Sequence, residues 1–182
     1  DVIPTTVGEY LLTDGGRNLI LNSNFSKGLQ NWLIQRPNAV VEYGLLKMIN
    51  NDGTNPSASI YQPRPLLDKN KEYVATINIK GVGRLNVNWG GNPNTWINFS
   101  NEDFEDIVIQ IPNQPNSNQN IVFYVNSADY SYIKHIKLEL GSTPTEYSPA
   151  PEDGYGLDLP NGAYHIQGTE GYTTADFLNT VS

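Results

Sequence analysis

Short apolar segments separated by turn-forming residues recur along most of the chain. From Asn18 onward, Gly, Pro, Asn and Asp interrupt the apolar runs, and no run shows helical periodicity. Turns at intervals of about eight to twelve residues are typical of β-sandwiches and barrels. The pattern predicts about nine strands, at residues 18–25, 39–49 (in two pieces hinged at Gly44), 58–62, 72–80, 84–89, 95–100, 105–111, 120–125 and 131–140.

Strict alternation in the middle strands predicts which side chains face the core. Successive side chains of a strand point to opposite faces, so residues 73, 75, 77 and 79 share one face and residues 74, 76 and 78 the other. By the same rule Ile107, Ile109 and Ile111 oppose Val108, whereas Ile121, Phe123 and Val125 oppose Tyr124 and Asn126. We expect the first-named set of each strand to be core.

The segments outside this pattern predict the organisation of the chain. Residues 1–16 end in the turn-forming run TDGG and are expected to be a connector, followed by one sandwich domain at 17–141. Residues 142–156, rich in Pro and Gly, are expected to form a linker. Residues 157–182 alternate like the start of a further β module, but they are too short to bury their own apolar groups. We therefore expect them to associate, with a homotrimer as the candidate assembly.

The charge and cysteine content of the chain limit the kinds of partner and metal site that it can have. With 11 Lys and Arg against 19 Asp and Glu, the formal net charge of −8 disfavours nucleic acid and anionic membrane surfaces. The chain contains no Cys, so disulfides and thiolate metal sites are excluded. Its first residues lack the basic and apolar regions of a signal peptide. We therefore expect a piece of a longer protein, made in bacterial cytoplasm and acting outside the cell.

Two segments, RNLILNSNFSKGLQNW (17–32) and YIKHIKLELGSTPTEYSPAPED (132–153), carry a family resemblance. Together they bracket a module that resembles the carbohydrate-binding-module-like domains of tail fibre and baseplate proteins from phages of Gram-positive hosts. The resemblance implies a jelly-roll β-sandwich without catalytic activity. It further implies a virion location in the phage tail, other tail proteins as partners, and adsorption to a cell-wall or capsular saccharide of the host.

The opening segment is similar to the first strand of jelly-roll carbohydrate-binding modules. This similarity implies that Phe25 and Trp32 pack in the core and that Gly28 turns the chain between them. Many such modules hold a structural Ca²⁺ with an acidic residue after the Phe, but Ser26 occupies that position here. Asn24 and Glu139 remain as candidate oxygen ligands, because Ca²⁺ prefers six to eight oxygens. We expect no tightly bound cofactor.

Saccharide binding needs an aromatic face that stacks on a sugar ring, with amides or carboxylates beside it to meet the hydroxyls. The segment RLNVNWGGNPNTWINFS (84–100) contains two Trp residues among several Asn residues. Trp96 is expected to face away from the core, whereas Trp89 shares the parity of core residues and becomes a contact only if it lies beyond the strand end. The candidate ligand contacts are Trp96, Asn98, Trp89, Asn88, Tyr124, Asn126 and Tyr130.

Catalysis has little support in the sequence. His135 lies within a predicted strand and His165 in the C-terminal segment, and neither belongs to a recognisable nucleophile motif. The carboxylates at 102, 103, 105 and 106 form one acidic turn, which favours a solvated loop over a glycosidase pair. Two alternatives to phage adsorption stay open: a structural spacer or docking domain of the tail fibre, and a carbohydrate-binding appendage of a secreted glycosidase.

Overall fold

The computed structural model describes residues 16–36, 38–50, 57–63 and 67–155, a part of the chain that is almost entirely β. Its elements are β1 (Leu33–Arg36), β2 (Ala39–Glu42), β3 (Leu45–Ile49), β4 (Ala58–Tyr61), β5 (Tyr73–Trp89), β6 (Ile97–Ile111), β7 (Ile121–Leu140) and the short helix α2 (Pro151–Tyr155). Within these residues no helix has the length and apolar character needed to span a membrane. The predicted C-terminal module at 157–182, with its association, and nearly all of the predicted connector lie outside them.

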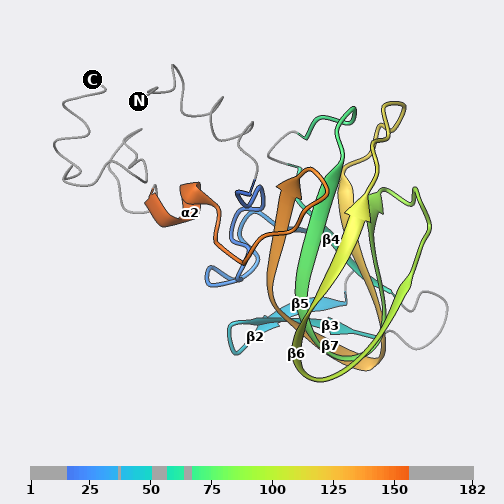
Figure 1. The fold of residues 1–182 in the computed structure, drawn as a ribbon. Helices are drawn as coiled ribbons and strands as arrows, with labels where there is room; N and C mark the ends of the chain where they lie inside the picture. The colour runs from blue at the N-terminus through green and yellow to red at the C-terminus, as the bar shows by residue number, and fades with distance from the viewer. Residues whose placement is uncertain (1–15, 37, 51–56, 64–66, 156–182) are drawn as a thin grey trace, which may run out of the picture.

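Antiparallel pairing builds two layers from one continuous set of strands. The first layer has the order β1, β4, start of β7, end of β5, start of β6, and the second has the order β2, β3, end of β7, start of β5, end of β6. The rings of Tyr73 and Trp89, at opposite ends of β5, have centroids 6.0 Å apart. A straight strand would separate these residues by about 53 Å. β5 therefore folds back on itself, which confirms the predicted jelly-roll sandwich (Figure 1).

The fold-back occurs where β5 and β7 approach each other most closely. The β5–β7 register shifts between Gly81 and Gly83. A Cβ at Gly81 would lie 2.9 Å from the Cβ of Ser131, and a Cβ at Gly83 would overlap the carbonyl oxygen of Asn126. The buried hydroxyls of Ser127 and Ser131 lie 2.6 Å apart on the opposing strand. Only glycine leaves room for this bend, which lies at the bottom of Figure 1 beside β2 and β3.

The strand count differs from the sequence prediction because the ladder continues round the bend. Residues predicted as six separate strands form the three long strands β5, β6 and β7. The predicted hinge within 39–49 is confirmed, because Tyr43 and Gly44 form the turn between β2 and β3. The strand β1 has no counterpart in the prediction.

The predicted strand at 18–25 is wrong, because this segment is a chain of turns. Asn22 and Phe25 have φ values of 47° and 58°, which a strand does not contain. The Asn22 side chain donates to the carbonyls of Gly28 and Gln30 and accepts from the Lys27 amide. Such side-chain bonds to nearby backbone compete with a strand ladder.

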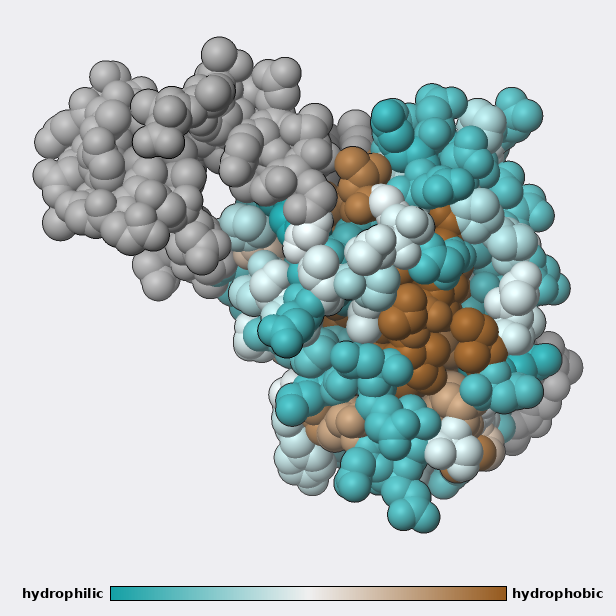
Figure 2. All heavy atoms as spheres, in the orientation of Figure 1, coloured by the Kyte–Doolittle hydropathy of each residue, from teal (hydrophilic) through white to brown (hydrophobic). Residues whose placement is uncertain are grey.

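The core confirms the predicted faces of 73–79 and 121–125, although Val74 and Val122 on the opposite faces are also buried and Ile107 is only partly buried. The buried cluster contains the odd-numbered side chains of 73–79 and of 121–125, and Phe25 and Trp32 join it. Those two rings stack at 5.5 Å, and the Trp32 Nε1–H donates to the Asn22 carbonyl. Outside the core the surface is mainly polar, with an apolar patch near the middle of the sandwich (Figure 2).

Residues 142–150, here called the C-terminal strap, are packed against the outer face of the second layer. The Lys137 ammonium donates to Thr145 Oγ1 and to the Glu146 carbonyl. The Tyr147 ring stacks on His135 with centroids 3.8 Å apart. Lys137 and Glu139, both on the outer face of β7, are buried as a result. In its described part the predicted linker thus covers the sandwich, whereas the division into domains stays a prediction.

Substituting Gly83 tests the bend. We expect Gly83→Ala to lower the free energy of unfolding by about 1–3 kcal/mol, because the added methyl has no space between β5 and β7. Urea denaturation measures the change. Ser100→Ala is the control, since Ser100 is exposed on β6 and should change stability by less than about 0.5 kcal/mol. Equal effects of the two substitutions would contradict the close approach.

The strap should make stability depend on pH through His135. Burial lowers the pKa of His135 below its ordinary 6.5, so the folded protein binds its proton less readily than the unfolded chain does. This contribution is complete above pH 6.5 and decreases as pH falls through the window between the two pKa values. We expect the melting temperature of His135→Phe, which keeps an aromatic ring against Tyr147, to fall less than that of the unaltered protein between about pH 7.5 and pH 5.5. Equal decreases in the melting temperatures of the two proteins over this pH range would contradict the expectation.

Candidate functional site

Four of the predicted ligand contacts lie together on the outer face of the first layer. Trp96 directly precedes β6, Asn98 lies at its start, and Tyr124 and Asn126 come from β7. Arg84 of β5 lies between them, directly opposite Asn98 on one side and Asn126 on the other. We call these five residues the Trp96 face.

Trp96 is held in place by three contacts. Its Nε1–H donates to Asn94 Oδ1 at 2.9 Å. The Arg84 guanidinium lies over the indole, 4.7 Å from the ring centroid, and the Tyr124 ring meets it edge to face at 6.3 Å. Trp96 itself remains partly exposed. The indole is therefore an oriented aromatic surface that solvent reaches.

Tyr124 and the two amides supply hydrogen-bonding groups beside that surface. Tyr124 lies opposite Asn86 in β5 and Ser59 in β4, and burial raises the pKa of its hydroxyl. The hydroxyl is accordingly protonated at neutral pH and is able both to donate and to accept hydrogen bonds. Asn98 is exposed and Asn126 half-buried. An aromatic ring flanked by neutral polar groups and one cation suits a hydroxyl-rich ligand.

Trp89 and Asn88 are not ligand contacts, contrary to the sequence interpretation. The ladder continues to the end of β5, so Trp89 stays on the core face, 2% exposed, and donates its Nε1–H to the Pro112 carbonyl. The Asn88 side chain is fully buried and bonds the Pro93 carbonyl and the Gly91 amide. Both residues shape the loop after β5 from inside, where a ligand does not reach them.

Tyr130 lies apart from the Trp96 face. It follows the bend in β7, is 45% exposed, and contacts Tyr132 with ring centroids 5.4 Å apart. The structure therefore divides the predicted contacts into a gathered set, a buried pair and one tyrosine elsewhere.

Arg84 is the residue of the Trp96 face that sequence reasoning missed. A signal for it was present, because Arg84 has the parity of Asn86 and Asn88, opposite to the core residues of the same strand. What the parity does not reveal is the partner, since the contact with Trp96 joins two strands separated by a loop.

The candidate calcium ligands are not brought together as a site. Both Glu139 carboxylate oxygens accept hydrogen bonds from Thr145, and Oε1 also lies 3.6 Å from the Lys137 ammonium. Asn24 is exposed and bonds the Ser26 amide within its own turn. In the described part of the chain no group of three or more His, Cys, Asp or Glu side chains is placed to hold a metal ion.

Comparison with solved structures places the fold among carbohydrate-binding modules. The chain is 13% identical to the Clostridium thermocellum endo-1,4-β-D-xylanase 10B CBM22-1–GH10 modules complexed with xylohexaose, at a TM-score of 0.51, covering 72% of this chain and 30% of that one. The second N-terminal cellulose-binding domain of Cellulomonas fimi β-1,4-glucanase C is 16% identical, with a TM-score of 0.49 and coverages of 72% and 99%. TmCBM61 in complex with β-1,4-galactotriose is 16% identical, with a TM-score of 0.45, and the match covers 69% of this chain and 99% of that one.

No family model and no curated protein matches the sequence. At these low identities the likeness concerns the fold. The class defined by that fold is a carbohydrate-binding-module-like β-sandwich.

Removing divalent metal should leave the described fold intact. We expect EDTA to shift the melting temperature by less than about 2 °C, because Thr145 and the Lys137 ammonium already satisfy the Glu139 carboxylate. Differential scanning calorimetry with EDTA and with added Ca²⁺ measures the shift. A decrease of about ten degrees or more on chelation would instead show that a bound metal stabilises the fold.

Proposed function

We propose that this chain is a non-catalytic module that binds saccharide through the Trp96 face. The observation that carries the proposal is the oriented, partly exposed indole of Trp96 on a sheet surface with Asn98, Tyr124 and Asn126 beside it. The carbohydrate-binding-module-like fold supports it further.

The bound sugar would stack on the indole face opposite Arg84. The guanidinium lies over one side of the ring and supports it. The other side is the one we assign to the apolar face of a pyranose. The sugar hydroxyls would meet the Asn98 and Asn126 amides and the Tyr124 hydroxyl. Since these groups are fixed on adjacent strands of a ladder, little ordering accompanies binding.

The biological setting we propose is the tail of a phage that infects a Gram-positive host. The support is the resemblance of residues 17–32 and 132–153 to the ends of phage tail modules. In that setting the ligand is a host cell-wall or capsular saccharide, and many copies per virion offset weak binding at each site. A spacer domain would need no exposed, oriented tryptophan, so the Trp96 face favours adsorption over that alternative.

The structural similarity to xylanase modules supports a competing setting, in which the chain is an appendage of a secreted glycosidase. Pull-down of the purified chain on Gram-positive cell walls and on insoluble xylan and cellulose separates the two. Retention by cell walls alone supports the phage setting, and retention by the plant polysaccharides alone supports the appendage.

Trp96→Ala tests the site itself. We expect affinity for the retained saccharide to fall at least about tenfold, or about 1.4 kcal/mol, because the stacking surface is lost. The melting temperature should stay within about 2 °C, since Trp96 is partly exposed and does not belong to the buried core cluster. Isothermal titration calorimetry and thermal melting provide the two readings.

The matched control is Val108→Ala, which removes an exposed apolar side chain from β6 away from the Trp96 face. It should leave the affinity unchanged. If Trp96→Ala binds as tightly as the unaltered chain, the site is assigned to the wrong face.

A further inference from the structure

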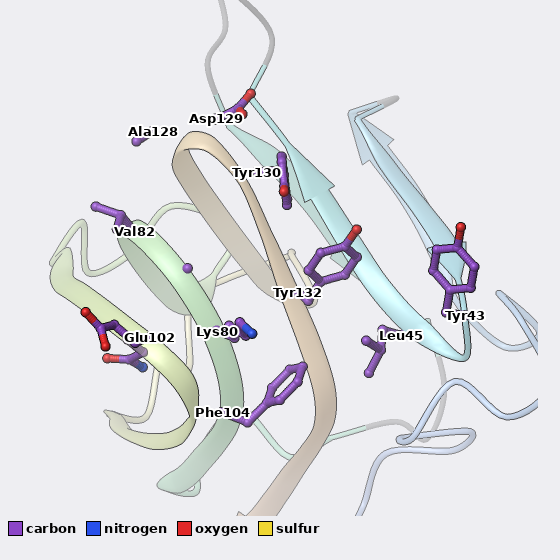
Figure 3. A pocket seen from close by; sticks show the side chains of 12 residues that line it. Tyr43, Leu45, Lys80, Val82, Glu102, Phe104, Ala128, Asp129, Tyr130 and Tyr132 are labelled. Atoms are coloured by element: carbon purple, nitrogen blue, oxygen red, sulfur yellow. The ribbon is translucent and has the colours of Figure 1, made fainter.

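A groove lies round the bend from the Trp96 face. This groove has a volume of about 680 Å³ and crosses β3, β7, β5 and β6, with Tyr43, Tyr130, Tyr132 and Phe104 among its lining residues (Figure 3). Its size is within the range of about 300–1,000 Å³ that is usual for small-ligand sites. The outward-facing row of β5 runs from Arg84 through Val82 to Lys80, and Val82 is a lining residue, so the groove begins about 7 Å along the strand from Arg84.

Tyr43 is the most unusual residue of this groove. It is 89% exposed and has φ = +54° in the two-residue turn between β2 and β3. Turns with positive φ at both central residues favour Asn, Asp or Gly, and a bulky side chain there carries a conformational cost. The fold recovers none of this cost by burying the ring. Strain of this kind at an exposed aromatic residue indicates a contact outside the chain.

The two tyrosines that β7 contributes to the groove are held in place before any ligand arrives. The Tyr132 hydroxyl donates to Glu42 Oε2 at 3.1 Å, and the Lys47 ammonium bonds the same oxygen at 3.1 Å. Lys47 also lies 4.7 Å from the Tyr130 ring centroid. One ion pair thus orients both tyrosine rings.

The charges at the groove give an anionic ligand no net attraction. The exposed carboxylates of Glu102 and Asp129 line it together with the Lys80 ammonium. The Lys134 ammonium lies 5.9 Å from the ring centroid of Phe104, another lining residue. Lys47 does not alter this balance, because Glu42 pairs with it. The two lining carboxylates accept hydrogen bonds from hydroxyl groups, whereas they repel uronates and phosphates.

We propose that this groove is a second saccharide site, which takes a neutral oligosaccharide stacked on Tyr43 with its hydroxyls toward Glu102 and Asp129. None of its lining residues belongs to the Trp96 face. A polysaccharide on a cell surface would engage both sites of one molecule, and linked sites raise the apparent affinity by orders of magnitude.

The test uses the full chain on an array of neutral oligosaccharides that includes xylohexaose and β-1,4-galactotriose, with oligogalacturonates as anionic probes. Tyr43→Asn removes the ring and places a residue suited to positive φ in the turn, so it should fold at least as stably as the unaltered chain. We expect Trp96→Ala to keep weak binding of a neutral probe. Tyr43→Asn in the Trp96→Ala background should weaken that residual binding at least about fivefold.

Amide chemical shifts locate the contact. On addition of the best neutral probe to the Trp96→Ala chain, the resonances of Lys80, Gly81, Glu102 and Tyr130 should move. The proposal is overturned if no neutral probe shows binding that depends on Tyr43, if oligogalacturonates bind there as tightly, or if the same amides move with protein concentration alone, which would indicate self-association. If Tyr43→Asn abolishes all binding while Trp96→Ala binds as tightly as the unaltered chain, the result supports this groove and refutes the site in the proposed function.

Discussion

The close approach of β5 and β7 at Gly81 and Gly83 is the constraint on which the rest of the molecule depends. Straight strands of 17 and 20 residues would be about 56 and 66 Å long and would not enclose a core. Because both strands turn at the same place, their two halves stack and the ring of Tyr73 reaches that of Trp89. The core, the two layers and both outer surfaces follow from this turn.

The first and last chain segments of the domain are joined by hydrogen bonds of the Asn18 side chain. Its amide donates to the carbonyls of Ile136 and Ser148, and its oxygen accepts from the amides of Ile20 and Leu138. The side chain is fully buried and bonds both ends of the domain, so it joins the first turn, the last strand and the strap. The Arg17–Glu152 pair, 2.8 Å apart, lies next to it. The two sequence segments that carry the family resemblance are therefore parts of one structural unit.

Alternation of apolar and polar residues predicted the faces of β5, β6 and β7 because side-chain parity persists wherever the ladder is regular. It did not predict the strand count, since Gly81 and Gly83 look like a turn in sequence while the pairing continues through them. The segment 18–25 was misassigned for the opposite reason. Its apolar residues suggest a strand, but the hydrogen bonds of Asn18 and Asn22 with neighbouring backbone determine its path.

The same reasoning explains the mixed outcome for the site. Parity placed Trp96 with Asn98, and separately Tyr124 with Asn126, on the outward sides of their own strands. The structure brings the two pairs together round Arg84. For Trp89 parity pointed to the core, and the alternative required the strand to end before it. The pairing of Trp89 with Ile121 shows that the strand still includes Trp89. The groove beside Tyr43 was beyond sequence reasoning, because its walls come from four strands that only the bend and the β2–β3 hairpin bring together.

Placing binding groups on long strands rather than on loops has a physical consequence for recognition. Each residue of the Trp96 face lies in or directly beside a ladder that is paired on both sides or anchored to the core, so its position is set by backbone hydrogen bonds. The groove shares β5, β6 and β7 with that face. The angle between the two surfaces is therefore determined by the bend and not by a hinge, and a glycan that reaches both must match a fixed geometry. Such rigidity sacrifices adaptability to varied ligands, but it reduces the ordering entropy lost when each sugar binds.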